Sequence, residues 1–192
     1  SRQTMPHMHQ VTRIPTLPHC FCAVDLGIDA LVIYEQAVNG MLSEKYRITV
    51  PAGQGPRHVA YTGNGSAYLV TEIGNCVYPV MFGENAGKVV GEGVSTLEDW
   101  TSVNLAAALW PTADDQGLLV SNRGEGTIVH YAIPSLEKKA VYRLPAKQPR
   151  DFCVLDNQRI VAACQDFGLV LLKDGKVIDT LPYMGAVRVL RV

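Results

Sequence analysis

Arginine, histidine and glutamate recur at matching points of the sequence, in a combination that can bind an anion and move a proton. His9, Arg57 and Arg150 each lie at the start of a short strand-like segment, and Glu72 lies at the end of another. Guanidinium groups stay charged and bind carboxylate or phosphate through two parallel hydrogen bonds. Histidine titrates near neutral pH, and a nearby glutamate can orient it, act as a base or balance the arginines. If the fold brings these side chains together, they predict a site for a small anionic substrate.

The elements that must position these side chains are repeated along the chain. Four segments, starting at Cys20, Ala67, Gly117 and Arg159, align without gaps, and each reads as strand, short turn, strand. Another strand precedes each pair and a weaker polar strand follows it. Four short strands per repeat of about 42–50 residues, with almost no helical periodicity, predict the blades of an all-β propeller. A β-sandwich is the alternative, but it does not need a repeated period.

The repeats predict a single, partial propeller domain with about four blades, over residues 7–52, 55–99, 105–146 and 148–183. Residues 185–192, GAVRVLRV, read as an extra first strand with no blade after it. Circular folds use such a strand to close the last blade onto the first. We therefore expect missing N-terminal blades, or self-association of the chain, to cover the blade faces left exposed.

Blade geometry predicts that the chemically useful residues share one rim. Neighbouring strands are antiparallel, so the start of the first strand and the end of the second lie at the same rim. This places Arg57 beside Glu72, and equal counting puts His9, Ala107 and Arg150 in the Arg57 position of the other repeats. The rim is then expected to carry His9, Arg57, Arg150, Glu72, Arg123 and Gln165, with His7, His58, Asn104 and Asp25 close by. The alternative is that the arginines are structural struts between blades.

Composition excludes several classes of function. A net charge of −1 gives no general attraction to nucleic acid or to an anionic membrane. No apolar run approaches the roughly 20 residues of a membrane span, and the first ten residues lack the features of a signal peptide. The five cysteines lie in apolar runs without CxxC spacing. They therefore predict reduced core thiols in a cytoplasmic protein and give no indication of a zinc site. We expect no metal and no other cofactor.

Four motifs in order carry a resemblance that covers nearly the whole chain. They are VDLGIDALVIYE, PAGQGPRHVAYTGNGSAYLVTE, NLAAALWPTADDQGLLVSNRGEGTIVHYAI and QPRDFCVLDNQRIVAACQD, followed by the terminal PYMGAVRVLRV. This pattern resembles the seven-bladed lactonase family, which includes 6-phosphogluconolactonases and carboxy-muconate lactonizing enzymes. Two departures are Thr71-Glu72 in place of the family's Asn-Glu, and Ala186-Val187 in place of a proline-aromatic pair.

The resemblance implies a site of one histidine, one glutamate and two arginines, at His9, Glu72, Arg57 and Arg123. In a phosphogluconolactonase the arginines would hold phosphate and polarise the lactone carbonyl, while His9 or Glu72 activates water. Arg150 and Gln165 are further candidates for substrate binding.

The expected function is therefore hydrolysis of a small anionic sugar lactone in the complete propeller, with 6-phosphogluconolactone as the leading candidate. Carboxy-cis,cis-muconate cycloisomerisation and a non-catalytic binding module remain alternatives. A calcium-dependent lactonase that uses Asp25, Glu72, Asn75 and Asn122 ranks last, because arginines on the same rim would repel the cation.

Overall fold

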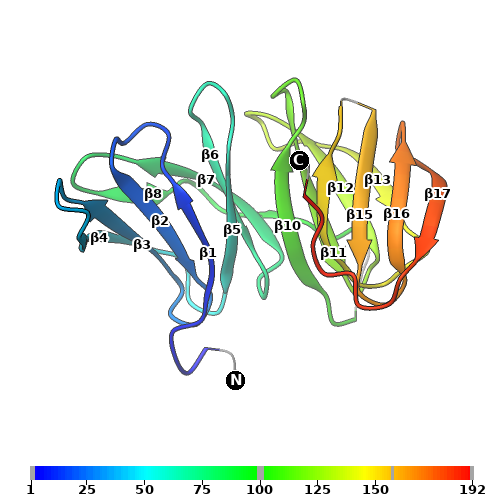
Figure 1. Cartoon of the computed structure of the whole chain (residues 1–192), viewed down its shortest axis with the longest axis horizontal. Helices are drawn as coiled ribbons and strands as arrows, with labels where there is room; N and C mark the ends of the chain where they lie inside the picture. Colours follow the sequence, from blue (N-terminus) through cyan, green and yellow to red (C-terminus); the bar gives the residue numbers. More distant parts are fainter. Residues whose placement is uncertain (1–2, 99–101, 157, 191–192) are drawn as a thin grey trace. The chain divides into compact units, whose positions relative to one another are not determined.

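The structure is a computed structural model that describes residues 3–98, 102–156 and 158–190. The chain folds into four antiparallel sheets of short strands, which confirms the all-β propeller architecture predicted from the repeats (Figure 1). The sheets belong to two compact units, Ser1–Val94 and Ser95–Val192. Among the described residues there is no helix that could cross a membrane.

Unit 1 contains two blades, and in each blade the strands pair in chain order. The first blade comprises β1 (Met8–Arg13), β2 (Cys20–Asp25), β3 (Ala30–Gln36) and β4 (Leu42–Thr49). The second comprises β5 (Pro56–Tyr61), β6 (Ala67–Thr71), β7 (Cys76–Phe82) and β8 (Gly87–Val89). The short strand β9 (Val94–Ser95), at the boundary of the units in the sequence, pairs with β7.

Unit 2 repeats the same arrangement. Its first blade comprises β10 (Leu105–Pro111), β11 (Gly117–Arg123), β12 (Thr127–Ala132) and β13 (Lys138–Arg143). Its second comprises β14 (Pro149–Val154), β15 (Arg159–Cys164), β16 (Gly168–Lys173) and β17 (Lys176–Pro182). Residues 99–101, which include the end of the segment predicted as the second blade, lie outside the described residues.

Apolar faces of neighbouring blades pack together within each unit. In unit 1, Leu31 and Ile33 of one blade share a core with Val59 and Leu69 of the next. In unit 2, Leu119 and Ile128 pack in one cluster with Phe152, Val170 and Leu172. Full burial of one apolar side chain of this size stabilises a fold by roughly 1.5–3 kcal/mol. The packing of these faces therefore holds neighbouring blades together. Cys20, Cys22 and Cys164 lie in these two cores, as their apolar sequence context predicts.

The segment expected to close the propeller has a different structure. Residues 185–190 form no strand, and residues 191–192 lie outside the described part of the chain. The segment is instead held by single hydrogen bonds: Gly185 N–H donates to Gln165 O at 2.9 Å, and Val189 N–H donates to Asp151 Oδ2 at 3.4 Å. A strand exists only where a neighbouring strand pairs with it, and the described residues 185–190 have no such ladder.

Candidate functional site

A β-bulge interrupts the first strand of every blade at the same point. The register shifts across His9 in β1, across Arg57 in β5 and across Arg150 in β14. In β10 the shift lies between Ala106 and Leu109. A bulge inserts one extra residue and changes the direction of a side chain, and such bulges are frequent beside active sites. The position that equal counting assigned to His9, Arg57 and Arg150 is therefore a repeated bulge.

Arg57 and Glu72 form a buried ion pair in unit 1. Arg57 Nε donates to Glu72 Oε2 at 2.8 Å, and the two side chains are 4% and 0% exposed. The backbone N–H of Glu72 donates to Gly55 O at 2.8 Å, which ties the end of β6 to the entry of β5. Desolvating two charges is costly unless their geometry is good, so this pair strongly favours one orientation of the guanidinium.

His9 approaches the same carboxylate oxygen from β1. Its Nε2 lies 3.9 Å from Glu72 Oε2, and its side chain is 15% exposed. The His7 ring lies against it, with a centroid distance of 5.1 Å. Because one carboxylate faces both a guanidinium and an imidazole, it can balance a proton taken up by His9. The His9 side chain is partly exposed although its Nε2 atom is enclosed, and His58 of the neighbouring strand is half-buried, whereas Glu72 is fully enclosed.

His58 completes the cluster, which we call the Arg57 cluster: His9, Arg57, His58 and Glu72. His58 Nε2 lies 3.1 Å from Arg57 Nη1, so two consecutive residues of β5 contact each other through their side chains. Sequence reasoning placed His58 nearby but gave it no role.

Two aspartates of the VDLGID motif orient the backbone around this cluster. Asp25 Oδ1 accepts from His7 N at 2.7 Å and from Gly27 N at 2.9 Å. Asp29 accepts from Gly55 N at 2.7 Å through Oδ1. A Cβ at Gly27 would lie 1.8 Å from Met5 O, so the position requires glycine. Asp25 is thus engaged by backbone amides, and within the described residues no three His, Cys, Asp or Glu side chains are grouped to hold a metal ion.

Arg123 lies in unit 2 at the end of β11, where it is 5% exposed. Asn122, which precedes it, forms a buried network: its Oδ1 accepts from Thr96 Oγ1 at 2.8 Å and from Asn104 Nδ2 at 3.2 Å. Its Nδ2 donates to Thr96 O and Thr127 Oγ1. The network fastens Thr96 and Asn104 to the strand that carries Arg123. Sequence reasoning missed Thr96 and Thr127, because isolated threonines give no periodic signal.

The remaining predicted residues occupy equivalent positions in the second blade of unit 2. Arg150 is the half-buried bulge residue of β14, and Gln165 follows β15 with an exposed side chain. Asp166 accepts from the backbone amides of Lys147 and Gln148 at 2.8 and 3.0 Å, and so holds the chain that enters β14. The structure therefore joins His9, Arg57 and Glu72 in unit 1, whereas Arg123, Arg150 and Gln165 belong to unit 2.

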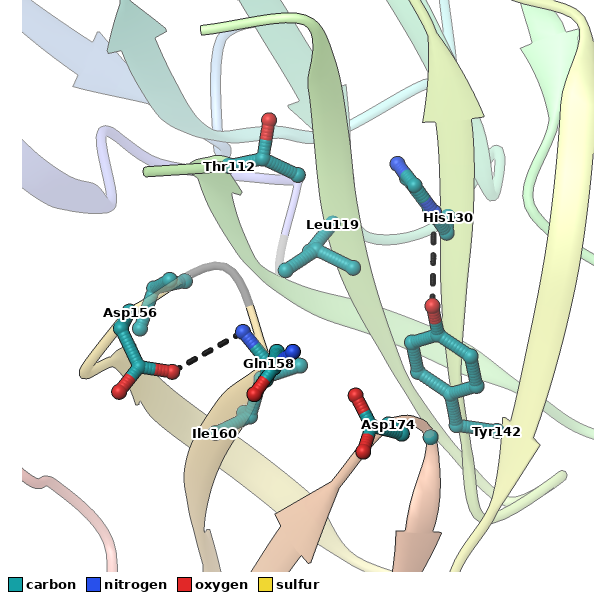
Figure 2. Close-up of a pocket in the computed structure, with 10 residues that line it drawn as sticks. Thr112, Leu119, His130, Tyr142, Asp156, Gln158, Ile160 and Asp174 are labelled. Atoms are coloured by element: carbon teal, nitrogen blue, oxygen red, sulfur yellow. Dashed lines mark hydrogen bonds between the residues drawn. The ribbon is translucent and has the colours of Figure 1, made fainter. Parts of the chain in front are cut away.

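A cavity of about 50 Å³ lies at the other end of the unit 2 strands (Figure 2). His130 Nδ1 and Tyr142 OH are 3.4 Å apart in its wall, and burial lowers the pKa of His130. Asp156, which also lines it, accepts from Gln158 N at 2.9 Å and from Arg159 Nε at 2.7 Å. Because Leu119 in its wall precedes Arg123 on β11, the cavity is near the opposite rim of the blade from Arg123. The Arg57 cluster, with its shared carboxylate, is thus the better candidate for chemistry.

Comparison with known proteins extends these observations. The model of the family "Lactonase, 7-bladed beta-propeller" matches residues 1–172. The chain is 32% identical over 180 residues to the 6-phosphogluconolactonase of Bacillus subtilis. The aligned region covers 89% of this chain and 51% of that protein. This chain is also 27% identical over 188 residues to an uncharacterized protein of Staphylococcus saprophyticus. The aligned region covers 94% of this chain and 54% of that protein.

Solved structures show the same likeness. The periplasmic gluconolactonase PpgL of Pseudomonas aeruginosa superposes with a TM-score of 0.86 at 25% identity, over 98% of this chain and 57% of that one. A protein from Lactobacillus plantarum gives 0.85 at 28% identity, over 96% and 58%. The chain spans about half the length of the curated relatives it matches.

Proposed function

The chain belongs to the seven-bladed β-propeller lactonase family, and from this premise we propose that the complete propeller hydrolyses a small anionic sugar lactone, with 6-phosphogluconolactone as the leading substrate. The product would be 6-phosphogluconate. The observation that carries the proposal is the Arg57 cluster, in which Glu72 Oε2 lies 2.8 Å from Arg57 Nε and 3.9 Å from His9 Nε2.

In this proposal His9 is the general base. It removes a proton from water as the water oxygen attacks the lactone carbonyl, and Glu72 stabilises the imidazolium that forms. The ring C–O bond then breaks, and the proton returns from His9 to the departing ring oxygen. Glu72 is fully buried and bonded to Arg57, so it balances charge and does not itself activate water.

The arginines bind the substrate. Arg57 is oriented by Glu72 and suits the developing oxyanion or a substrate anion, because a guanidinium stays charged and presents several donors in one plane. Arg123, Arg150 and Gln165 belong to unit 2, and we retain them as candidate substrate-binding residues from the sequence resemblance. All five cysteines are free thiols, which is consistent with a reducing compartment, and we place the reaction in the cytoplasm.

Further blades are part of the proposal. The relatives are about twice as long as this chain, and every residue of β17 is exposed. Large apolar side chains are also exposed in unit 1, among them Val11 and Met41. We propose that blades from a longer polypeptide, or from a second copy of the chain, cover these faces.

The test is hydrolysis of 6-phosphogluconolactone, with unphosphorylated gluconolactone and carboxy-cis,cis-muconate as comparison substrates. His9→Gln should lower kcat by about 10²-fold or more with little change in KM, since it removes a proton carrier. Arg57→Lys should raise KM at unchanged net charge, because the planar fork is lost. Equal kcat for wild type and His9→Gln would refute the assignment of the base. Turnover of the muconate alone would replace the lactonase proposal with the cycloisomerase.

A further inference from the structure

We propose that His58 is a positioning residue that holds the Arg57 guanidinium in its binding orientation, and that it does so as a neutral imidazole with its proton on Nδ1. The inference rests on the proposed function, in which Arg57 contacts the substrate. All the residues that it involves lie within unit 1.

The contact between these two residues depends on the bulge. Successive side chains of a regular strand point to opposite faces of the sheet, so neighbours in sequence do not meet. In β5 the register shifts between Pro56 and His58, and Arg57 Nη1 lies 3.1 Å from His58 Nε2. The insertion of one residue removes the alternation and lets both side chains reach the same point.

The bulge alone does not produce the contact. Gln10 follows the bulge residue of β1 as His58 follows that of β5, yet Gln10 bonds to the backbone of β5: its Oε1 accepts from Val59 N at 2.7 Å, and its Nε2 donates to Val59 O at 3.2 Å. In β14 the corresponding Asp151 accepts from Phe152 N and Val189 N. The hydrogen bond to the bulge residue Arg57 therefore depends on the histidine side chain at position 58.

The chemistry of the two groups fixes the proton on His58. A guanidinium has only donors and stays protonated, so Arg57 Nη1 must donate and His58 Nε2 must accept. A neutral imidazole that accepts through Nε2 carries its proton on Nδ1. An imidazolium here would place two donors and two positive charges together.

The guanidinium is thus held from two directions. Glu72 Oε2 accepts from Nε at 2.8 Å and His58 Nε2 accepts from Nη1 at 3.1 Å. Arg57 is 3% exposed, so an acceptor lost at this site is not simply replaced by bulk water. A guanidinium fixed in this way loses less conformational freedom when an anion binds.

The experiment combines NMR with binding of 6-phosphogluconate to the complete propeller, for which the function is proposed. Long-range ¹⁵N spectra of the histidine-labelled protein at pH 7.5 should show His58 neutral, with an acceptor-type Nε2 and a protonated Nδ1. His58→Gln keeps an acceptor oxygen, and its Kd for 6-phosphogluconate should stay within about threefold of wild type. His58→Leu removes the acceptor and should raise Kd by about tenfold, the usual effect of losing one hydrogen bond to a charged group.

A variant at the other end of β5 controls for loss of stability. Thr62 Oγ1 bonds to Asn64 Oδ1 and Ser66 O, so Thr62→Val weakens the same blade without a contact to Arg57. It should leave both the Arg57 Nε–H resonance and the Kd unchanged. The Arg57 resonance should be retained in His58→Gln and broadened in His58→Leu.

The outcomes separate this inference from the proposed function. A His58 protonated on Nε2, or equal effects of leucine and glutamine, would overturn the positioning role. If the wild type neither binds 6-phosphogluconate nor hydrolyses the lactone, but the tautomer and the Arg57 resonance behave as expected, the proposed function fails and the role of His58 in holding Arg57 is supported.

Discussion

The buried pair of Arg57 and Glu72 makes a quantitative prediction about unit 1. Glu72→Gln keeps the shape of the side chain but leaves Arg57 as a buried cation with a neutral partner. Both side chains are almost fully enclosed, at 4% and 0% exposed, so solvent offers little compensation. Breaking a buried pair by neutralising one member costs about 3–5 kcal/mol. Since a tenfold change in an equilibrium constant corresponds to about 1.4 kcal/mol, the opening equilibrium should rise by about 10²- to 10³-fold or more.

Native-state hydrogen exchange resolves this change by location. Amides of β5 and β6 should exchange faster by that factor, while those of β10–β13 in unit 2 should not change. Glu44→Gln is a matched control in the same unit, because Glu44 and Arg47 form an ion pair whose side chains are 41% and 54% exposed. Exposed pairs of this kind contribute little, so exchange in the control should stay close to wild type.

A double-mutant cycle then tests whether the two charges act as a pair. Arg57→Met combined with Glu72→Gln removes both charges, and its cost should be clearly smaller than the sum of the single costs. A less than tenfold effect of Glu72→Gln on the β5 and β6 amides would refute the reasoning. If the cost of the double variant equals the sum of the two single costs, Arg57 and Glu72 do not stabilise the fold as a pair.

Two further predictions concern groups outside the Arg57 cluster. Burial raises the pKa of Cys22 and of Cys164 to about 12 each, so neither thiol should react with a disulfide reagent at pH 8 until the protein is denatured; rapid labelling of either in native protein would contradict this. Burial lowers the pKa of His130 below its usual 6.5, so as the pH falls the unfolded chain binds this proton before the folded protein does. The contribution of His130 to stability should therefore be constant above about pH 6.5 and fall below it. Urea unfolding at pH 7.5 and 5.5 should show a smaller fall for His130→Gln, and an equal fall would count against this cause.

The blades could be predicted from the sequence because the features that specify them are local and repeated. Apolar strands alternate with short turns that contain residues suited to positive φ, such as Gly65 at +87° between β5 and β6 and Asn75 at +53° between β6 and β7. The terminal segment could not be predicted in the same way. Residues 185–190 have a strand-like composition, but a strand also needs a partner, and composition does not show whether one is present.

The rim position of Arg57 and Glu72 was predictable because it follows from antiparallel pairing alone. The contact between Arg57 and His58 was not, since the alternation of side chains along a strand predicts that these neighbours point apart. Only the register of β5 against β6 reveals the bulge that brings them together. The network around Asn122 was missed for a related reason, because its partners come from separate segments of the chain.

Geometry also distinguishes between the roles that the sequence left open for Glu72. A general base needs contact with the water it activates, and Glu72 is fully buried with Oε2 bonded to Arg57. The same oxygen lies 3.9 Å from His9 Nε2, where a positive charge would form during catalysis. In the proposed reaction, a carboxylate in this position would stabilise both the Arg57 guanidinium and the imidazolium that forms on His9. His9, which is partly exposed and faces this carboxylate, is therefore the residue in the cluster that we expect to exchange a proton with substrate water.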